Sequence, residues 1–253
     1  MTEHAIIVTN VGSADTAIWS RPLMQRYCDR FGLDYVEIRD TAFSFKGVDP
    51  DYNYLNFEKF QAFDALSRYE RILRLDTDVL ISPAAPNIFD QVPESCMGVV
   101  YEDCGNKAEK RHADMEEVAR EFQGSPWNRH RYFNSGVMVV SRRHRDVFRL
   151  TPQDRRAIES GRLGRPKEQN LCNWKVREAG CPIHELDYRF NHMRMFSERW
   201  NGAPHRLGSY FVHYAGARGR KDRRMRRDYF RLLAAWDRGA SPLPWWRRLE
   251  QRA

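Results

Sequence analysis

Two aspartates, Asp76 and Asp78, are the residues of this sequence with the clearest chemical potential. They follow the apolar run Ile72–Leu75, interrupted only by Arg74, which indicates a buried strand that opens into a loop. Two carboxylates two positions apart at such a place can converge on one hard divalent cation and leave coordination positions open for phosphate oxygens. A solvated turn, in which the carboxylates cap neighbouring backbone groups, also explains an isolated Asp-x-Asp pair.

The same pair occurs in haloacid-dehalogenase phosphatases, where the first aspartate is the nucleophile and the second the acid. That signature requires Thr or Val at its fifth position, which is Leu80 here. It also normally lies on the first strand of its domain, whereas 75 residues precede Asp76. The pattern therefore disfavours a phosphatase of this class.

Two further segments carry polar groups suited to a sugar. Asn134 and Gly136 directly precede an apolar strand and offer an amide and a close backbone approach to sugar hydroxyls. Glu168, Gln169 and Asn173 begin a predicted helix, where acid and amide side chains also serve as ordinary caps. Neither segment identifies a site when it is taken alone.

The fourth segment combines a metal ligand with cations. His213 ends a predicted strand, and Gly216, Arg218, Arg220 and Lys221 follow it. A neutral imidazole is a good third ligand for manganese beside two carboxylates, and a glycine-rich cationic loop suits a diphosphate. A structural histidine at the end of a strand remains the alternative.

The elements that must position these residues follow from hydrophobic periodicity. A strand over 5–8, a helix from Trp19 to Phe31 closed by Gly32, and a strand over 35–38 form a βαβ unit, which implies a parallel sheet with ligands at its carboxyl ends. Further elements are a helix over 57–67, strands over 72–75, 98–101, 136–140 and 210–214, and an exposed helical insertion over 107–123.

Composition limits the class of protein. The chain has 253 residues, 42% hydrophobic and 30% charged, which is enough for a substantial core. It has no run of about 20 apolar residues and no signal-like start, so we expect a cytoplasmic protein. Its five cysteines form no Cys-x-x-Cys pair, which predicts reduced thiols and neither a disulfide framework nor a structural zinc site.

The net charge of +8 lies entirely at the end of the chain. Residues 218–253 hold 12 of the 42 Lys and Arg and 4 of the 34 Asp and Glu, so residues 1–217 are balanced. The balanced body disfavours a general nucleic-acid-binding face. In the tail, cationic and apolar residues at helical spacing, together with Trp245, Trp246, Arg247 and Arg248, predict reversible contact with anionic membranes.

In this order and at these separations, the motifs resemble the retaining glycosyltransferases of family 8, the group of glycogenin and the bacterial lipooligosaccharide galactosyltransferases. The resemblance spans about residues 5 to 221. Its matching positions are Thr9-Asn10 after the first strand, Lys59, Asp76 to Asp78, Phe89-Asp90, the FNSGV segment around Asn134, Glu168-Gln169 with Asn173, and His213 with Gly216. Glu168 replaces the family's aspartate, and Gly219 replaces its lysine, with Arg220 or Lys221 as substitutes.

The resemblance implies a GT-A fold, a single α/β domain with a mixed sheet and a Rossmann-like nucleotide-binding half over residues 1–217, followed by the basic helical tail 218–253. It implies Mn²⁺ or Mg²⁺ held by Asp76, Asp78 and His213, and a nucleotide-sugar donor, most often a UDP-hexose. Gln169 would lie beneath the anomeric carbon, with Asn134 and Glu168 on the sugar hydroxyls. Donor contacts would come from Thr9, Asn10, Lys59, Thr77, Gly216, Arg218, Arg220 and Lys221.

The acceptor is expected to be a glycan or a lipid-linked glycan. We expect the segments 46–53 and 107–131 to cover it, because Tyr52, Tyr54 and Trp127 could stack on sugar faces. Two other classes remain as alternatives: a nucleic-acid or membrane-surface binding protein that uses the tail, and a sugar nucleotidyltransferase. The latter requires a glycine-rich loop after the first strand, which Gly12-Ser13-Ala14 does not supply.

Overall fold

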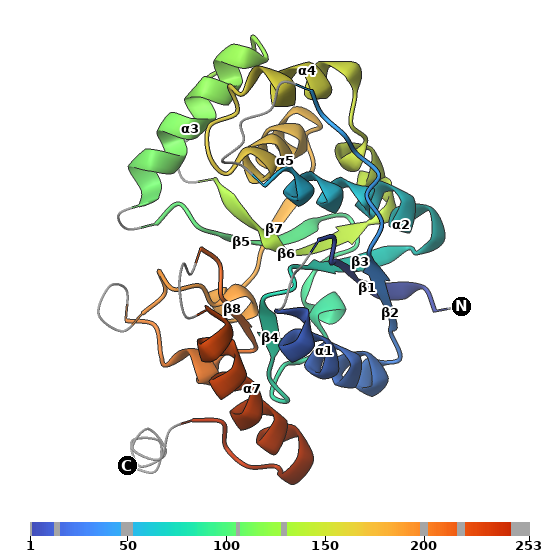
Figure 1. The fold of residues 1–253 in the computed structure, drawn as a ribbon, viewed down its shortest axis with the longest axis vertical. Helices are drawn as coiled ribbons and strands as arrows, with labels where there is room; N and C mark the ends of the chain where they lie inside the picture. The colour runs from blue at the N-terminus through green and yellow to red at the C-terminus, as the bar shows by residue number, and fades with distance from the viewer. Residues whose placement is uncertain are drawn as a thin grey trace.

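A six-stranded mixed sheet forms the centre of the protein in a computed structural model (Figure 1). The structure describes residues 2–12, 16–46, 53–104, 107–127, 131–197, 202–216 and 221–243. The strands, in sheet order, are β2 (Asp34–Ile38), β1 (His4–Thr9), β3 (Arg71–Leu75), β6 (Phe133–Ser141), β5 (Met97–Tyr101) and β7 (Ile183–Glu185). β6 is antiparallel to both of its neighbours, and the other pairs are parallel.

Helices and a two-stranded ribbon cover the two faces of the sheet (Figure 1). One face carries α2 (Ala62–Arg68), α3 (Ala108–Glu121), α4 (Pro152–Ser160) and α5 (Lys167–Glu178). The other carries α1 (Ala17–Phe31), α7 (Lys221–Arg238) and the ribbon of β4 (Val79–Ile81) and β8 (Phe211–His213). Short 3-10 helices are η1 (Tyr54–Gln61), η2 (Ile88–Gln91), η4 (Arg142–Phe148), η5 (Tyr188–Asn191) and η6 (Arg206–Gly208).

Side-chain alternation along the strands divides the core into two layers. In β1, Ala5 and Ile7 pack into the layer that contains α3 and α5, whereas Ile6 and Val8 pack into the layer of α1. The first βαβ unit matches its prediction, since β2 is parallel to β1 and Gly32 closes α1 with φ of 64°. All five cysteines are free thiols, as expected.

Three predicted elements differ from the structure. β6 begins at Phe133 rather than at residue 136, so Asn134 lies inside the strand and not in a turn before it. The predicted helix over 57–67 starts as the 3-10 helix η1 and becomes α-helical only from Ala62. The insertion over 107–123 is not an exposed appendage, because α3 buries Met115 and Val118 in the core beside α5.

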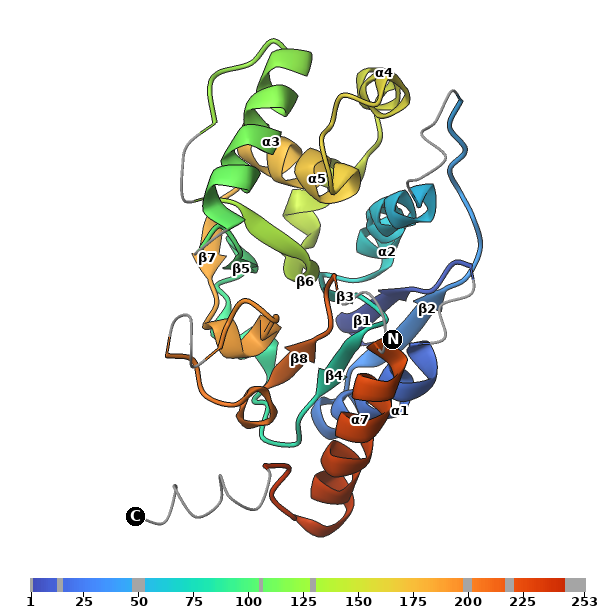
Figure 2. The ribbon, with the colours of Figure 1, turned by 60° about the vertical axis from the view of Figure 1, so that its left-hand side comes forward.

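The helix predicted in the basic tail is present as α7, and its apolar face is covered by the body of the protein. Met225 and Leu232 are fully buried in a cluster with Leu23 of α1 and Leu80 of β4. Figure 2 shows α7 beside α1 and β4. Residues 221–238 are therefore packed structure and not a free amphipathic helix. Among the described residues, no helix is long and apolar enough to span a membrane. Trp245, Trp246, Arg247 and Arg248 lie outside the described residues.

Candidate active site

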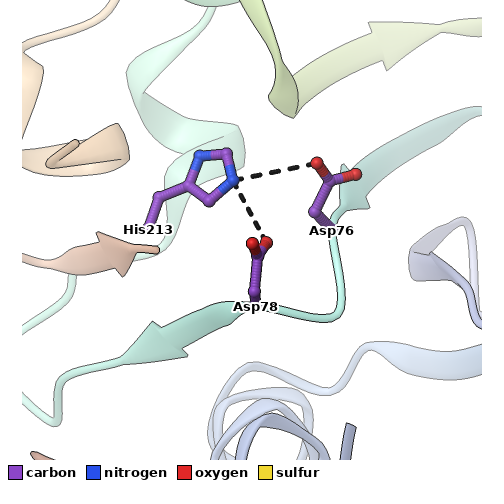
Figure 3. A group of neighbouring side chains, drawn as sticks. All are labelled: Asp76, Asp78 and His213. Carbon is purple, nitrogen blue, oxygen red and sulfur yellow. Dashed lines mark ion pairs between the residues drawn. The ribbon is translucent and has the colours of Figure 1, made fainter. Parts of the chain in front are cut away.

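Strand register brings the predicted metal ligands together. Asp76 follows β3 and Asp78 precedes β4, while β4 pairs antiparallel with β8 so that Val79 lies opposite His213. This pairing places the His213 Nε2 atom 3.1 Å from Oδ1 of Asp78 and 3.7 Å from Oδ2 of Asp76 (Figure 3). One ligand atom from each residue lies within 4.8 Å of the other two. Two carboxylate oxygens and one imidazole nitrogen form a donor set that suits Mn²⁺ or Mg²⁺.

A chain of amide hydrogen bonds determines which His213 nitrogen faces the carboxylates. The backbone N–H of Gly136 donates to Oδ1 of Asn134 at 2.8 Å, which fixes the orientation of that amide. Asn191 Nδ2 donates to the same Oδ1 at 3.1 Å, so Asn191 Oδ1 accepts from Nδ1 of His213 at 2.8 Å. Nδ1 therefore carries a proton, and Nε2 is the nitrogen available to a metal. This arrangement fits the proposed cation.

The side-chain amide of Asn134 uses all of its hydrogen-bonding groups in this network. Its Oδ1 accepts two hydrogen bonds, and its Nδ2 donates to Oε2 of Glu102 at 2.7 Å and to Oε1 of Gln169 at 3.1 Å. Two lone pairs and two N–H groups are the full capacity of an amide. In this conformation Asn134 positions its neighbours and has no spare donor for a sugar hydroxyl.

Gln169 is equally constrained at the start of α5. Its Oε1 also accepts from the backbone N–H of Ser135 at 3.0 Å, and its Nε2 donates to the hydroxyl of Tyr132 at 2.9 Å. Because a backbone N–H can only donate, the oxygen of Gln169 must face Ser135. The Tyr132 hydroxyl in turn donates to Asn170 Oδ1 at 2.6 Å. The amide of Gln169 is thus held rigidly beside the metal cluster.

Buried cations compensate the acidic groups. Nζ of Lys59 lies 3.0 Å from Asp76 and 3.3 Å from Glu168, and the fully buried Arg74 also pairs with Asp76. Burial by itself would raise the pKa of Asp76, but Lys59 and Arg74 outweigh it and lower that pKa. Burial likewise opposes the charge of Lys59, and Asp76 and Glu168 outweigh it and raise its pKa. The Asp76 carboxylate is therefore ionised at neutral pH.

Lys221, the first residue of α7, reaches the other aspartate. It pairs with Asp78, whose pKa burial alone would raise but which His213 and Lys221 hold well below its usual range. Lys221 is thus the cation of the tail that the structure brings to the metal cluster. Arg218 and Arg220, the other predicted cations, lie outside the described residues.

A pocket of about 440 Å³ opens on the two aspartates. It is lined by predicted donor contacts from separate parts of the chain, namely Thr9, Lys59, Thr77 and Lys221. Asn10 does not line it, because its side-chain amide turns to Glu37 and donates to that carboxylate at 2.7 Å. Gly216 follows β8 in the left-handed region, with φ of 63°, at an exposed position.

Glu102 and Asn191 are site residues that the sequence analysis missed. Glu102 is buried directly after β5, 2.7 Å from Arg111 and 2.7 Å from Asn134. Burial alone would raise its pKa, but Arg111 and neighbouring donors lower it. An acid directly after an apolar strand is the pattern that drew attention to Asp76, and it could have identified Glu102 too. No comparable signal marks Asn191.

Of the three aromatic residues expected over the acceptor, the two that the structure describes pack against other side chains. Trp127 is only 7% exposed and packs into the core, with the guanidinium of Arg177 over its ring. Tyr54 packs against Phe45 and Phe57. The expectation is therefore wrong for Trp127, because α3 and α5 enclose the segment that carries it. Tyr52 lies outside the described residues.

Comparisons with known proteins bear on the family and the fold of this chain. Residues 6–217 match the family model described as glycosyl transferase family 8. A search of curated protein sequences gives no significant match. Among solved structures, the chain is similar to the galactosyltransferase LgtC in complex with donor and acceptor sugar analogues, with a TM-score of 0.59 and 12% identity over 97% of this chain and 99% of that chain.

Two more solved structures resemble this chain. Mouse xyloside xylosyltransferase 1 has a TM-score of 0.51 and 14% identity over 85% of this chain and 99% of that chain. A glycosyltransferase involved in the glycosylation of the major capsid of PBCV-1 has a TM-score of 0.50 and 15% identity over 87% of this chain and 99% of that chain. At these identities the likeness concerns the fold, which is the predicted GT-A fold.

Proposed function

The chain belongs to glycosyl transferase family 8 and is a glycosyltransferase, and on that premise we propose that it is a metal-dependent, retaining hexosyltransferase. Its donor is a nucleoside diphosphate sugar, a UDP-hexose in this proposal, and its acceptor is a glycan or lipid-linked glycan. The observation that carries the proposal is the cluster of Asp76, Asp78 and His213, whose two aspartates line the 440 Å³ pocket.

The charges around the pocket suit a leaving diphosphate. A divalent cation bound by the three ligands would neutralise the charge that develops on the diphosphate. Lys221 lies at the same pocket and adds a second positive charge, while Thr9 and Thr77 offer hydroxyls to the nucleotide. Lys59 keeps Asp76 and Glu168 in position, and we propose that Glu168 contacts the sugar hydroxyls. Asn10, Gly216, Arg218 and Arg220 remain predicted donor contacts.

The environment of Gln169 favours one of the two routes to retention. An amide oxygen is a weak nucleophile, and this one already accepts hydrogen bonds from Ser135 and Asn134. An attack by Gln169 on the anomeric carbon would have to break them. We therefore propose front-face attack by the acceptor hydroxyl, with the departing phosphate taking the proton. Proton NMR of the first product formed from an α-linked donor should display an α-linkage, and a β-linkage would refute retention.

Metal dependence is tested by removing one ligand at a time. Asp76→Asn and Asp78→Asn each replace an anionic ligand by a neutral amide of the same shape, so Mn²⁺ affinity should fall by about tenfold or more, and donor hydrolysis with it. Asp146→Asn, at a carboxylate that is 81% exposed and remote from the pocket, is the matched control. Calorimetric titration with Mn²⁺ and a hydrolysis screen over nucleotide sugars give the two measurements. Full activity in a chelator would refute the metal site.

We also propose contact with an anionic membrane at the inner leaflet of a cytoplasmic membrane, through the outer face of α7. Phe230 of α7 and Ile18 of α1 are 53% and 55% exposed, and the helices that carry them are neighbours. Arg223 and Arg226 are exposed on the same helix as Phe230. An apolar side chain among arginines is the pairing that favours a lipid interface.

Liposome sedimentation tests this contact. Binding to vesicles with anionic lipid should occur at low salt and weaken as salt is added, since each engaged arginine contributes about 1 kcal/mol. Arg223→Gln combined with Arg226→Gln should abolish it, and neutral vesicles serve as the control. Point variants are required, because ending the chain within α7 would uncover the core around Leu232. Equal binding to neutral and anionic vesicles would refute the proposal.

A further inference from the structure

A second pocket, of about 380 Å³, adjoins the metal cluster on the side of His213. Its walls come from the segment after η5, from β8 and the residues that follow it, and from α7. The first turn of α7 separates the two pockets, because Lys221 lines the pocket of the aspartates and Arg224, three residues later, lines this one. In Figure 2, β8 lies between the segment that carries η5 and helix α7. Each pocket is therefore lined by part of the cluster where transfer would occur, the first by Asp76 and Asp78 and the second by His213.

The second pocket is positively charged. No aspartate or glutamate is among the described residues that line it, whereas Arg194, Arg206 and Arg224 are. Arg206 is neutralised by the buried Asp228, to which it donates at 2.7 and 2.9 Å. Arg194 and Arg224 form no ion pair with any residue that the structure describes, and Arg224 only stacks over a tyrosine ring. Two guanidinium groups thus remain available to an anion.

One of the histidines that line the pocket, His192, is uncharged. His192 is buried, and burial lowers its pKa to about 4, so it is neutral at physiological pH. Its Nδ1 contacts the Ser209 hydroxyl at 2.7 Å and its Nε2 contacts the Phe196 carbonyl at 2.8 Å. His192 therefore adds no positive charge to that of the arginines.

Apolar side chains complete the pocket and suit a sugar better than a bare ion. Phe196, Met193 and Val212 line it together with the arginines. Sugar rings present apolar C–H faces that pack on such side chains, while their substituents bind polar groups. A free inorganic anion would gain nothing from this part of the wall.

We propose that this second pocket binds the acceptor, and that the acceptor carries a phosphate or carboxylate group held by Arg194 and Arg224. The inference rests on the proposed glycosyltransfer and specifies its acceptor class. Front-face transfer needs the acceptor hydroxyl to approach the anomeric carbon from the side of the leaving diphosphate, and this pocket is lined by His213, one of the three residues of the cluster proposed to hold the cation at that diphosphate. Guanidinium groups bind phosphate and carboxylate through paired hydrogen bonds, which accounts for two arginines in one pocket that form no ion pair with any described residue.

The test measures binding with the donor pocket already filled. Full-length protein saturated with Mn²⁺ and UDP is titrated by calorimetry with glucose, glucuronate and glucose 6-phosphate, and with the galactose and mannose equivalents. We expect at least one charged sugar to bind about tenfold more tightly, or better, than its neutral form. The ratio of glucuronate to glucose 6-phosphate affinity then identifies which anion the pocket prefers.

Variants link the preference to the two arginines. Arg194→Gln and Arg224→Gln should each reduce the tenfold preference to less than threefold. Arg194→Lys and Arg224→Lys should keep part of it, since they retain the charge but lose the paired hydrogen bonds. Arg238→Gln, at an exposed position of the same helix and outside the pocket, should leave it unchanged. Neutral sugars that bind as tightly as charged ones, or inorganic phosphate that binds as tightly as the sugar phosphate, would overturn the inference.

Hydrolysis of UDP-hexoses by the unmodified enzyme separates the two proposals. Hydrolysis of a donor without any preference for charged acceptors overturns the acceptor inference alone. Failure to hydrolyse or transfer any nucleotide sugar overturns the proposed function and the acceptor role together, even if the arginine-dependent binding persists.

Discussion

The buried carboxylate of Asp228 anchors helix α7 to the body of the enzyme. It accepts hydrogen bonds from Nε of Arg206 at 2.9 Å, from Nη2 of the same residue at 2.7 Å and from the Tyr214 hydroxyl at 2.7 Å. The same helix carries Lys221 and Arg224, which line the two pockets. We therefore expect Asp228→Asn to destabilise the fold and to loosen the part of the site that α7 provides.

The magnitude follows from the burial of the two partners. Removing one member of a fully buried ion pair costs about 3–5 kcal/mol, but the side chain of Arg206 is 22% exposed and is partly solvated when left alone. We expect a loss of about 2–3 kcal/mol, or a fall in Tm of about 4–12 °C for a chain of this size. Asp237→Asn is the matched control on the same helix. Its pair with Arg26 is 40% and 43% exposed, so the cost should stay below about 1 kcal/mol.

Urea denaturation at a series of pH values tests whether the ionised carboxylate of Asp228 is the source of this stability. Burial would raise the pKa of Asp228, but Arg206 and Tyr214 outweigh it and lower that pKa in the folded state. The ionised carboxylate thus contributes stability that is fully present above its unfolded pKa of about 3.9 and is lost as the pH falls through the folded value. The difference between wild type and Asp228→Asn should therefore shrink below about pH 4. If Asp228→Asn costs no more than Asp237→Asn at pH 7, the anchoring role is refuted.

Two predictions concern the network around the metal ligands. Gly136→Ala would place a Cβ atom 2.1 Å from Cε1 of His213, so the Mn²⁺ affinity measured by titration should fall by about tenfold or more. Gly208→Ala is the control, because its Cβ would meet only one side chain, at ordinary contact distance, and should leave the Mn²⁺ affinity unchanged. An unchanged Mn²⁺ affinity in Gly136→Ala would contradict the close approach. Tyr132→Phe removes the hydroxyl that accepts from Gln169, and a loss of about 1–3 kcal/mol is expected in urea denaturation; a loss below about 0.5 kcal/mol would show that the buried amide finds another partner.

Local features of the sequence were sufficient for the first βαβ unit and for two of the three candidate metal ligands. Alternating burial, the glycine cap at Gly32 and the short distance between the first two strands determine a βαβ unit without reference to distant residues. Asp76 and Asp78 are two positions apart, so the backbone alone brings their carboxylates together. Their position at the end of an apolar run was enough to predict where in the sheet they lie.

Only the tertiary structure decided what surrounds these aspartates. The sequence predicts His213 as the third ligand, but the pairing of β8 with β4 is what brings it to the aspartates. Asn191 sets the protonated nitrogen of His213 from a segment that carries no recognisable motif. Arg74 interrupts an apolar strand in the sequence, and its pairing with Asp76 becomes visible only when both are buried together. Long-range strand pairing and burial create these contacts, and neither is encoded within one stretch of residues.

The basic tail shows most clearly which features the sequence determines and which the tertiary structure decides. Charge and helical spacing correctly predicted a cationic amphipathic helix over residues that form α7, but they do not specify what covers its apolar face. In the structure that face packs against α1 and β4, and Lys221 and Arg224 are turned toward the two pockets. A periodic pattern determines that a face will be buried, whereas the partner is chosen by the shape of the rest of the protein.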